Sequence, residues 1–90
     1  MKQIQFTPIE VVTYSGYKAD ERPVSFLYGN IRYTIENIVD RWYEGGEIAG
    51  RKIIHYYKVD TERNEQFLLK HDPEVDRWEA SRTKRSKLDN

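Results

Sequence analysis

The sequence predicts an all-β domain in which about five to six short antiparallel strands form a meander, either a small barrel or a curled sheet. The first observation is a run of alternating apolar and polar residues on both sides of Gly29-Asn30. The second is the recurrence of short β-prone segments between polar turns. Because a chain of 90 residues supports only one core, we expect a single domain over residues 1–82 and a disordered basic tail over residues 83–90.

The most strongly predicted element is a β-hairpin that turns at Gly29-Asn30. Glycine and asparagine tolerate the positive φ angles that a two-residue hairpin turn requires. Apolar residues alternate with other residues on each side of this pair, as expected of strands with one face on a core. The alternating residues are Val24, Phe26 and Tyr28 before the turn and Ile31, Tyr33 and Ile35 after it.

The segment after Ile35 fits two structures. Ile35, Ile38, Val39 and Trp42 have the spacing of one helical face. However, the β-branched and aromatic residues here favour a strand, and the alternation before Ile35 continues into the segment without a break. We expect the strand to continue to about Ile38, with a bulge, and an α+β fold with one helix near residues 35–43 is the alternative.

The remaining strands follow from shorter patterns of the same kind. A strand over Lys52–Val59 has apolar or aromatic residues on both faces, which is typical of a central strand. Pro8 lacks a backbone N–H and is expected at a strand end or a sheet edge. The other strands are predicted over Ile9–Tyr14, Gln66–Lys70 and Val75–Ser81.

Charge and composition exclude several classes of protein. The 15 basic and 15 acidic residues cancel, so no overall field attracts the chain to nucleic acid or to an anionic membrane. Only the tail is locally basic. The absence of cysteine excludes disulfides, thiolate nucleophiles and cysteine-based metal sites. No apolar run is long enough for a membrane span or a secretory signal, so we expect a cytoplasmic protein.

Candidate catalytic residues are few. His55 and His71 are the two histidines and thus the two near-neutral acid–base groups. His55 lies among apolar residues, where we expect a packed, hydrogen-bonded ring, and His71 begins a polar turn, where we expect a solvated ring. No serine lies in a nucleophile-elbow context, and the glycines lack the spacing of a phosphate-binding loop. We therefore predict no catalytic, metal or cofactor site.

Aromatic residues are more numerous than one small core requires. Two identical tripeptides, Asp40-Arg41-Trp42 and Asp76-Arg77-Trp78, place an arginine beside a tryptophan. Exposed aromatic and arginine side chains suit protein interfaces and also stacking on single-stranded bases. In a competing interpretation, each arginine covers its own tryptophan through a cation–π contact. The candidate binding residues are Arg41, Trp42, Tyr43, Tyr56, Arg77 and Trp78.

The order of motifs between Arg22 and Glu79 resembles a family of small uncharacterised bacterial proteins and domains. The motifs are RP-x-x-F, GNIRYTIENIVDRW, HYYKV, FLLKHD and DRWE. That family is associated with the neighbourhood of translesion-type DNA polymerases. The resemblance implies a DNA-related accessory module, and it supplies no active-site residues.

Together these observations predict a non-enzymatic binding or accessory module. The first hypothesis is a protein partner, and the second is single-stranded nucleic acid. A third hypothesis is a small hydrolase-like enzyme that uses His55 and His71. The expected oligomeric state is a monomer or a weak dimer.

Overall fold

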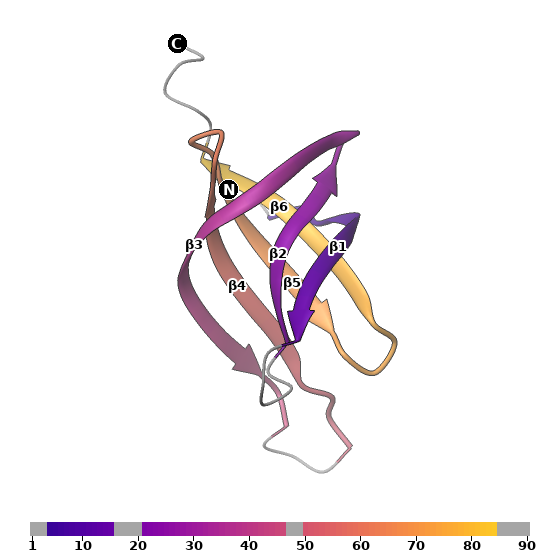
Figure 1. Cartoon of the computed structure of the whole chain (residues 1–90). Coiled ribbons are helices and arrows are strands. Elements are labelled where there is room, and N and C mark those ends of the chain that lie inside the picture. The colour runs from indigo at the N-terminus through magenta and orange to yellow at the C-terminus, as the bar shows by residue number, and fades with distance from the viewer. Residues whose placement is uncertain (1–3, 16–20, 47–49, 85–90) are drawn as a thin grey trace.

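The computed structural model describes residues 4–15, 21–46 and 50–84. These residues form six antiparallel β-strands and no helix, and hence no helix that could span a membrane. Each strand pairs with the next, and β6 pairs with β1 to close a barrel (Figure 1). The predicted small antiparallel barrel is confirmed. The strands are β1 (Thr7–Ser15), β2 (Glu21–Tyr28), β3 (Ile31–Glu44), β4 (Ile54–Thr61), β5 (Gln66–Asp72) and β6 (Arg77–Lys84).

The predicted hairpin joins β2 to β3. Gly29 and Asn30 have φ angles of 58° and 66°, which is the conformation of a type I′ turn. The turn places Phe26 directly opposite Tyr33, and their rings stack with centroids 5.3 Å apart. Both strands of the hairpin therefore present aromatic rings to the same core.

The helix considered for residues 35–43 is wrong, because β3 continues as a strand to Glu44. The strand is also longer than the predicted end near Ile38. The ten residues of β3 from Ile35 to Glu44 lie along the eight residues of β4, and eight of the ten pair with it. β4 supplies a pairing partner along this whole length, which a local sequence pattern cannot reveal.

Two β-bulges explain the helix-like spacing. Glu36 and Val39 are the extra residues at which the pairing of β3 with β4 shifts. Each bulge adds one residue to the strand, so the alternation of side chains between the inner and the outer face resumes one residue later. The side chains that face the interior therefore recur at every third residue, at Ile35, Ile38 and Arg41, each opposite a buried residue of β4.

Two strand boundaries in the structure differ from the predicted ones because the barrel closes between β6 and β1. β1 begins at Thr7 rather than Ile9, because Thr7–Ile9 pairs with β6. Thr83 and Lys84, which we assigned to a disordered tail, belong to β6. The Thr83 hydroxyl donates a hydrogen bond of 3.2 Å to the carbonyl oxygen of Gln66 on β5, which continues the ladder. The rest of the predicted tail, residues 85–90, lies outside the described residues.

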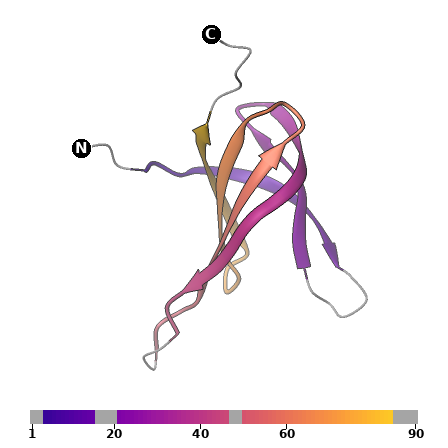
Figure 2. The same ribbon diagram turned by 90° about the vertical axis from the view of Figure 1, so that its left-hand side faces the viewer.

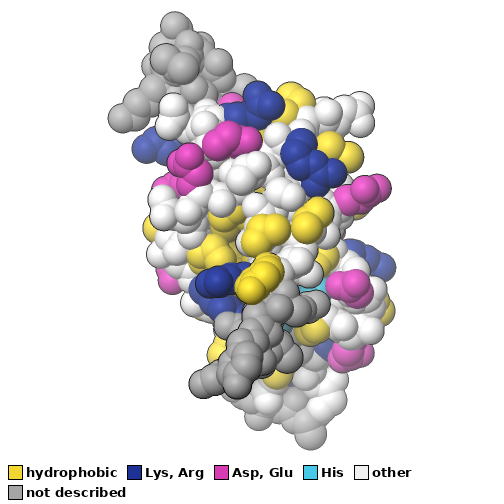
Figure 3. Space-filling model, viewed as in Figure 1, with side chains coloured by type: hydrophobic (Ala, Val, Ile, Leu, Met, Phe, Trp, Pro, Cys, Tyr) yellow, Lys and Arg dark blue, Asp and Glu magenta, His cyan; other side chains and the backbone are white. Residues whose placement is uncertain are grey.

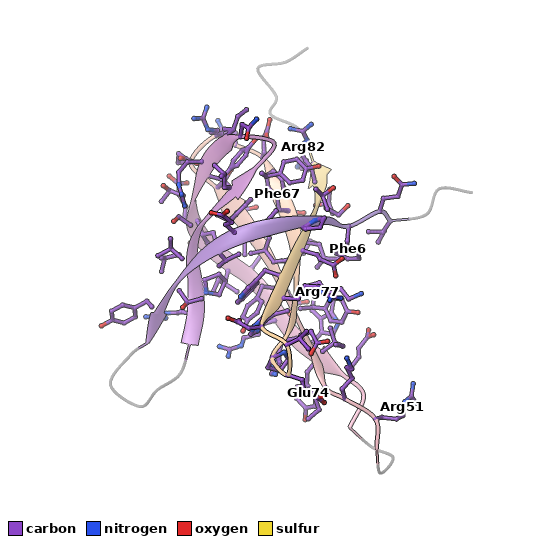
Figure 4. The ribbon with its side chains drawn as sticks, turned by 90° about the vertical axis from the view of Figure 1, so that its right-hand side faces the viewer. Phe6, Arg51, Phe67, Glu74, Arg77 and Arg82 are labelled. Carbon is purple, nitrogen blue, oxygen red and sulfur yellow. The ribbon has the colours of Figure 1, made fainter. Side chains whose placement is uncertain are left out.

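The core is a cluster of aromatic rings supported by small aliphatic side chains. Phe67 of β5 lies at the centre, with its ring centroid 5.0 Å from Phe26 and 4.8 Å from Tyr33. These rings contact edge to face, an arrangement favoured by the ring quadrupoles. The other buried hydrophobic residues are Tyr57, Val59, Leu69, Trp78 and Ala80. Phe67 and Arg82 lie toward one end of the barrel, and Glu74 and Arg77 lie toward the other (Figure 4).

The barrel opens at the end formed by the β1–β2, β3–β4 and β5–β6 connections. Pairing between β2 and β3 ends at Ser25 and Thr34. Past Thr34, β3 turns away from β2 and pairs with β4 alone among the described strands. Figure 2 shows the β1–β2 hairpin and the β3–β4 hairpin pointing in different directions at this end. The open end is where most of the candidate residues lie.

Candidate binding surfaces at the open end of the barrel

The six predicted binding residues do not form one surface. Trp42 and Tyr56 lie on the outer face of the barrel wall, where both are half-buried. Arg41 and Trp78 lie on the inner face, where Arg41 is exposed at the open end and Trp78 is buried. Tyr43 lies at the end of β3 and is 65% exposed. The structure therefore divides the predicted site into an outer surface and an inner cavity, with Arg77 exposed on β6.

On the outer surface, Trp42 and Tyr56 are direct cross-strand neighbours. Their rings stack with centroids 5.3 Å apart and planes 12° apart. Burial of the Tyr56 hydroxyl raises its pKa, and the nearby Glu44 carboxylate raises it further. Both rings are half-buried. The pair is thus a preformed aromatic ledge beside the end of β3.

The expectation that each arginine covers its own tryptophan is wrong for Arg41. The guanidinium carbon of Arg41 lies 5.3 Å from the ring centroid of Tyr57, the residue opposite it on β4. Adjacent residues of a strand point to opposite faces, so Arg41 cannot share a face with Trp42. Among the described residues, the cations that lie over an aromatic ring cover tyrosine or phenylalanine rings.

The inner cavity has a volume of about 180 Å³ and is called here the histidine cavity. Four adjacent strands, β3 to β6, and the β5–β6 turn supply its walls. It is lined by Arg41, His55, Tyr57, His71, Pro73 and Trp78. His55 and His71 are opposite each other on β4 and β5. The two histidines of the chain therefore meet in one cavity.

His71 is buried, so the prediction of a solvated ring is wrong. Only 7% of the residue is exposed, because the closed barrel places Trp78 of β6 directly beside it. The His71 and Trp78 rings stack with centroids 4.0 Å apart. Atom Nε2 of His71 lies 3.0 Å from Oδ1 of Asp76, which hydrogen-bonds the ring from the β5–β6 turn.

His55 is half-buried, with Tyr43 opposite it on β3. Burial lowers the pKa of His55, and the positive charges of His71 and Arg41 lower it further. We expected a packed and hydrogen-bonded His55. The ring is packed between two strands, and its electrostatic surroundings favour the neutral form.

The described residues contain no group of three His, Asp or Glu side chains placed to hold a metal ion. A larger hollow of about 540 Å³ lies elsewhere, and its lining is almost entirely polar. It is lined by Glu36, Asn37, Asp60, Thr61, Asn64, Glu65, Gln66 and Lys84. Its side chains are mainly acids and amides, whereas small-molecule sites are lined predominantly by hydrophobic and aromatic side chains.

A third feature is a strand edge that pairs with only one described strand. The last five residues of β3, Asp40–Glu44, pair in regular register with β4 and with no other described strand. This segment is called here the free edge of β3. Val39, immediately before it, is 51% exposed. A second hollow, of about 440 Å³, lies between β2 and β3 just before the free edge.

Sequence reasoning did not predict the contact of Arg41 with Tyr57 or the free edge of β3. For the turn from Asp72 to Asp76, it did not show which carboxylate contacts His71, and in the structure Asp76 does so. The identical tripeptides also misled, because Trp42 faces out and Trp78 faces in. Each of these features depends on which strands become neighbours.

Comparison of the chain with protein-family models, with curated proteins and with solved structures found no match. The resemblance to domains associated with translesion-type polymerases therefore stays a prediction.

Proposed function

We propose that this protein is a non-enzymatic binding module whose partner is a protein, and that an extended segment of the partner pairs with the free edge of β3. The observation that supports this most directly is that Asp40–Glu44 pairs on one side only among the described strands. Alternate residues of such a strand direct their N–H and C=O groups away from the sheet. Extended peptides bind exposed edges of this kind by adding a strand.

The side chains on the free edge indicate the chemistry of the partner. On the outer face, Asp40, Trp42 and Glu44 follow one another, so an aromatic ring lies between two carboxylates. A complementary strand would have a basic side chain opposite each acid and an apolar side chain against Trp42. The exposed Tyr43 adds apolar contact area on the other face. The proposed ligand is therefore a basic, extended segment.

The same acids argue against the other hypotheses for this surface. Carboxylates beside the aromatic ledge repel phosphate groups, which disfavours a single-stranded nucleic acid here. A second copy of the chain is also disfavoured. An antiparallel pairing of two free edges centred on Trp42 would place Asp40 of one copy opposite Glu44 of the other, and like charges in that position are destabilising.

The hydrolase-like hypothesis depends on His55 and His71. They are cross-strand neighbours that line the same cavity, so their positions do not argue against that hypothesis. The binding proposal rests on the free edge of β3 and does not involve these two side chains. If the resemblance to polymerase-associated domains holds, the partner of this module belongs to such a DNA polymerase assembly.

The experiment uses two labelled peptides, Lys-Thr-Leu-Thr-Lys and Glu-Thr-Leu-Thr-Glu, and measures their binding by fluorescence anisotropy. We expect the protein to bind the lysine peptide and not the glutamate peptide. The double substitution Asp40→Lys with Glu44→Lys should reverse this preference, because it changes the sign of both outer charges.

The matched control is Glu10→Lys with Glu74→Lys, which makes the same change of net charge at exposed acids outside β3. It should leave the preference for the lysine peptide intact. Equal loss of binding in both double variants would show that net charge alone drives association. Failure of both peptides to bind, with tight salt-sensitive binding of a single-stranded oligonucleotide, would overturn the proposal in favour of nucleic acid.

A further inference from the structure

We propose that the partner segment continues past the free edge of β3 and anchors two apolar side chains in the hollow between β2 and β3. This inference rests on the proposed function, because the same added strand is extended at its C-terminal end. Three features of the molecule support it. They are two strand edges that diverge, the apolar side chains between them, and the spacing that the bulges impose on β3.

β2 and β3 separate at a fork. Their pairing ends at Ser25 and Thr34, and beyond these residues each strand pairs with only one described neighbour. Glu21–Pro23 pairs with β1, and Ile35–Glu44 pairs with β4. Because β2 and β3 are antiparallel, both stretches run from the fork toward the open end of the barrel (Figure 2). One added strand can therefore lie between them.

The hollow of about 440 Å³ lies directly beyond this fork, and its volume is within the range of roughly 300–1,000 Å³ that is usual for ligand sites. Four of its seven lining residues are apolar: Pro23 and Val24 from β2, and Ile35 and Ile38 from β3. Val24 is 36% exposed, and Val39, which follows Ile38, is 51% exposed. Figure 3 shows hydrophobic side chains gathered on the face of the molecule where β2 and the first half of β3 lie. An apolar side chain of the partner would remove this surface from water.

The added strand pairs with β3 rather than with β2. β3 offers the long edge Ile35–Glu44, whereas the corresponding stretch of β2 is short and includes Pro23, which has no backbone N–H to donate. Antiparallel pairing is slightly more stable per residue than parallel pairing, and all neighbouring strands of this barrel are antiparallel. The partner segment is therefore antiparallel to β3, and its C-terminal end points into the fork.

The bulges of β3 fix the positions of the apolar anchors. Ile35 and Ile38 are three residues apart, whereas their partners on β4, Thr61 and Val59, are two residues apart. A regular strand added on the other side of β3 spans the same length without bulges and has the same spacing of two. Counted from the residue opposite Glu44, its sixth and eighth residues lie opposite Ile38 and Ile35. These two residues should be apolar.

The experiment compares three labelled peptides by fluorescence anisotropy. The short peptide Lys-Thr-Leu-Thr-Lys covers the free edge alone. The extended peptide Lys-Thr-Leu-Thr-Lys-Leu-Thr-Leu adds leucine at the sixth and eighth positions. The reversed peptide Leu-Thr-Leu-Lys-Thr-Leu-Thr-Lys has the composition of the extended one, but in antiparallel pairing its additional leucines lie beyond Glu44, away from the hollow.

We expect the extended peptide to bind the protein about tenfold more tightly than the short one. Two leucine side chains leave water, and the cost of ordering three more residues offsets part of this gain. The reversed peptide should bind no more tightly than the short one.

Val24→Trp tests the hollow itself, because a larger side chain at this position fills it. This variant should bind the short peptide as the parent does and should gain nothing from the extension. The matched control is Val12→Trp on β1, where the residue is 49% exposed and does not line the hollow. It should keep the tenfold gain. Circular dichroism checks folding, and if Val24→Trp does not fold, Asn37→Trp replaces it, because Asn37 is an exposed lining residue on β3.

Two results would overturn this inference and leave the proposed function standing. One is equal affinity of the short and the extended peptide for the parent protein. The other is an equal gain from the extended and the reversed peptide, which would show apolar association without a fixed position. In both cases the short peptide still binds. If none of the three peptides binds, the proposed function is wrong and this inference fails with it.

Discussion

The imidazole of His71 lies flat against the indole of Trp78, with ring centroids 4.0 Å apart and planes 12° apart. The two residues are direct neighbours across β5 and β6, and both are more than nine-tenths buried. This stack forms the wall of the histidine cavity and fixes the ring that contacts Asp76. The corresponding tryptophan of the other Asp-Arg-Trp tripeptide, Trp42, stacks on the outside of the barrel. The two tripeptides therefore occupy unlike environments, as expected of independent segments.

The first prediction concerns the hairpin core. Phe26 is fully buried and contacts the rings of Tyr33 and Phe67. Phe26→Ala should lower the free energy of unfolding by about 3–5 kcal/mol, because it leaves a cavity that the neighbouring rings cannot fill. Urea denaturation measures this change. The control Val75→Ala removes an exposed side chain and should change stability by less than about 0.5 kcal/mol. A loss below about 1 kcal/mol for Phe26→Ala would contradict the assigned core.

The second prediction concerns the bulge in β3. Val39 is an extra residue, so its deletion leaves Ile38 opposite Val59 and leaves Arg41 opposite Tyr57. We expect the deletion variant to remain folded and to lose no more than about 2 kcal/mol. Circular dichroism and urea denaturation measure the outcome.

Deletion of Lys58 is the matched control. Lys58 is exposed, but it is paired on both sides in β4. Its removal would turn one half of β4 over and move buried residues to the surface. This variant should show no cooperative unfolding. Similar behaviour of the two deletion variants would show that the register assigned to β3 is incorrect.

The third prediction contrasts two ion pairs. Arg82 lies 3.3 Å from the carboxylate of Glu65, whose side chain is 9% exposed. Arg82→Gln should lower the free energy of unfolding by about 1–3 kcal/mol, because it leaves a buried carboxylate with fewer partners. Lys52, whose side chain is 51% exposed, pairs with Asp72 at 2.9 Å, and Asp72 keeps a hydrogen bond from the backbone N–H of Glu74 when Lys52 is changed. Lys52→Gln should leave the urea midpoint unchanged within error, and a larger effect than that of Arg82→Gln would refute this assignment.

The fourth prediction concerns pH. Burial, His71 and Arg41 lower the pKa of His55 in the folded protein below its ordinary value near 6.5. The groups that face it are Arg41 and Tyr43 from β3 and His71 from β5. As pH falls through about 6.5, the unfolded chain therefore binds a proton at His55 before the folded protein does. Stability should decrease over this range and then level off below the folded pKa.

Comparison with His55→Gln isolates this contribution. The free energy of unfolding is measured by urea at about pH 7.5 and about pH 5.5, on either side of the ordinary histidine pKa. The decrease on acidification should be smaller in His55→Gln than in the parent protein. An equal or larger decrease would mean that the pKa of His55 is not lowered in the folded protein.

Much of the fold could be predicted because local rules agree there. Gly29 and Asn30 accept positive φ angles, and the residues around them alternate with period two, so the hairpin needs no information from distant segments. The boundaries and the helix alternative failed where the partner strand decides the structure. The two bulges of β3 give a spacing that resembles a helix, and only the eight residues of β4 on the other side of the ladder show otherwise.

The candidate site was predicted in part. Tyr56, Arg77 and Trp78 were correctly placed on strands, whereas Arg41, Trp42 and Tyr43 lie beyond the end predicted for their strand near Ile38. The six residues also do not share one surface, since Trp42 with Tyr56 and Arg41 with Trp78 lie on opposite faces of the barrel wall. The direction of a side chain depends on every bulge before it in the strand. A bulge is set by the register with a neighbouring strand, and a single shift reverses all later side chains.

By itself, then, the sequence determined that this chain is one antiparallel β-domain with a tight turn at Gly29-Asn30, because turn geometry and alternation are encoded within a few residues. Only the tertiary structure decided that His55 and His71 share a cavity with Arg41, and that the end of β3 pairs with β4 alone among the described strands. Those arrangements arise from closure of β6 onto β1 and from unequal strand lengths, which are properties of strand pairs and not of any one segment.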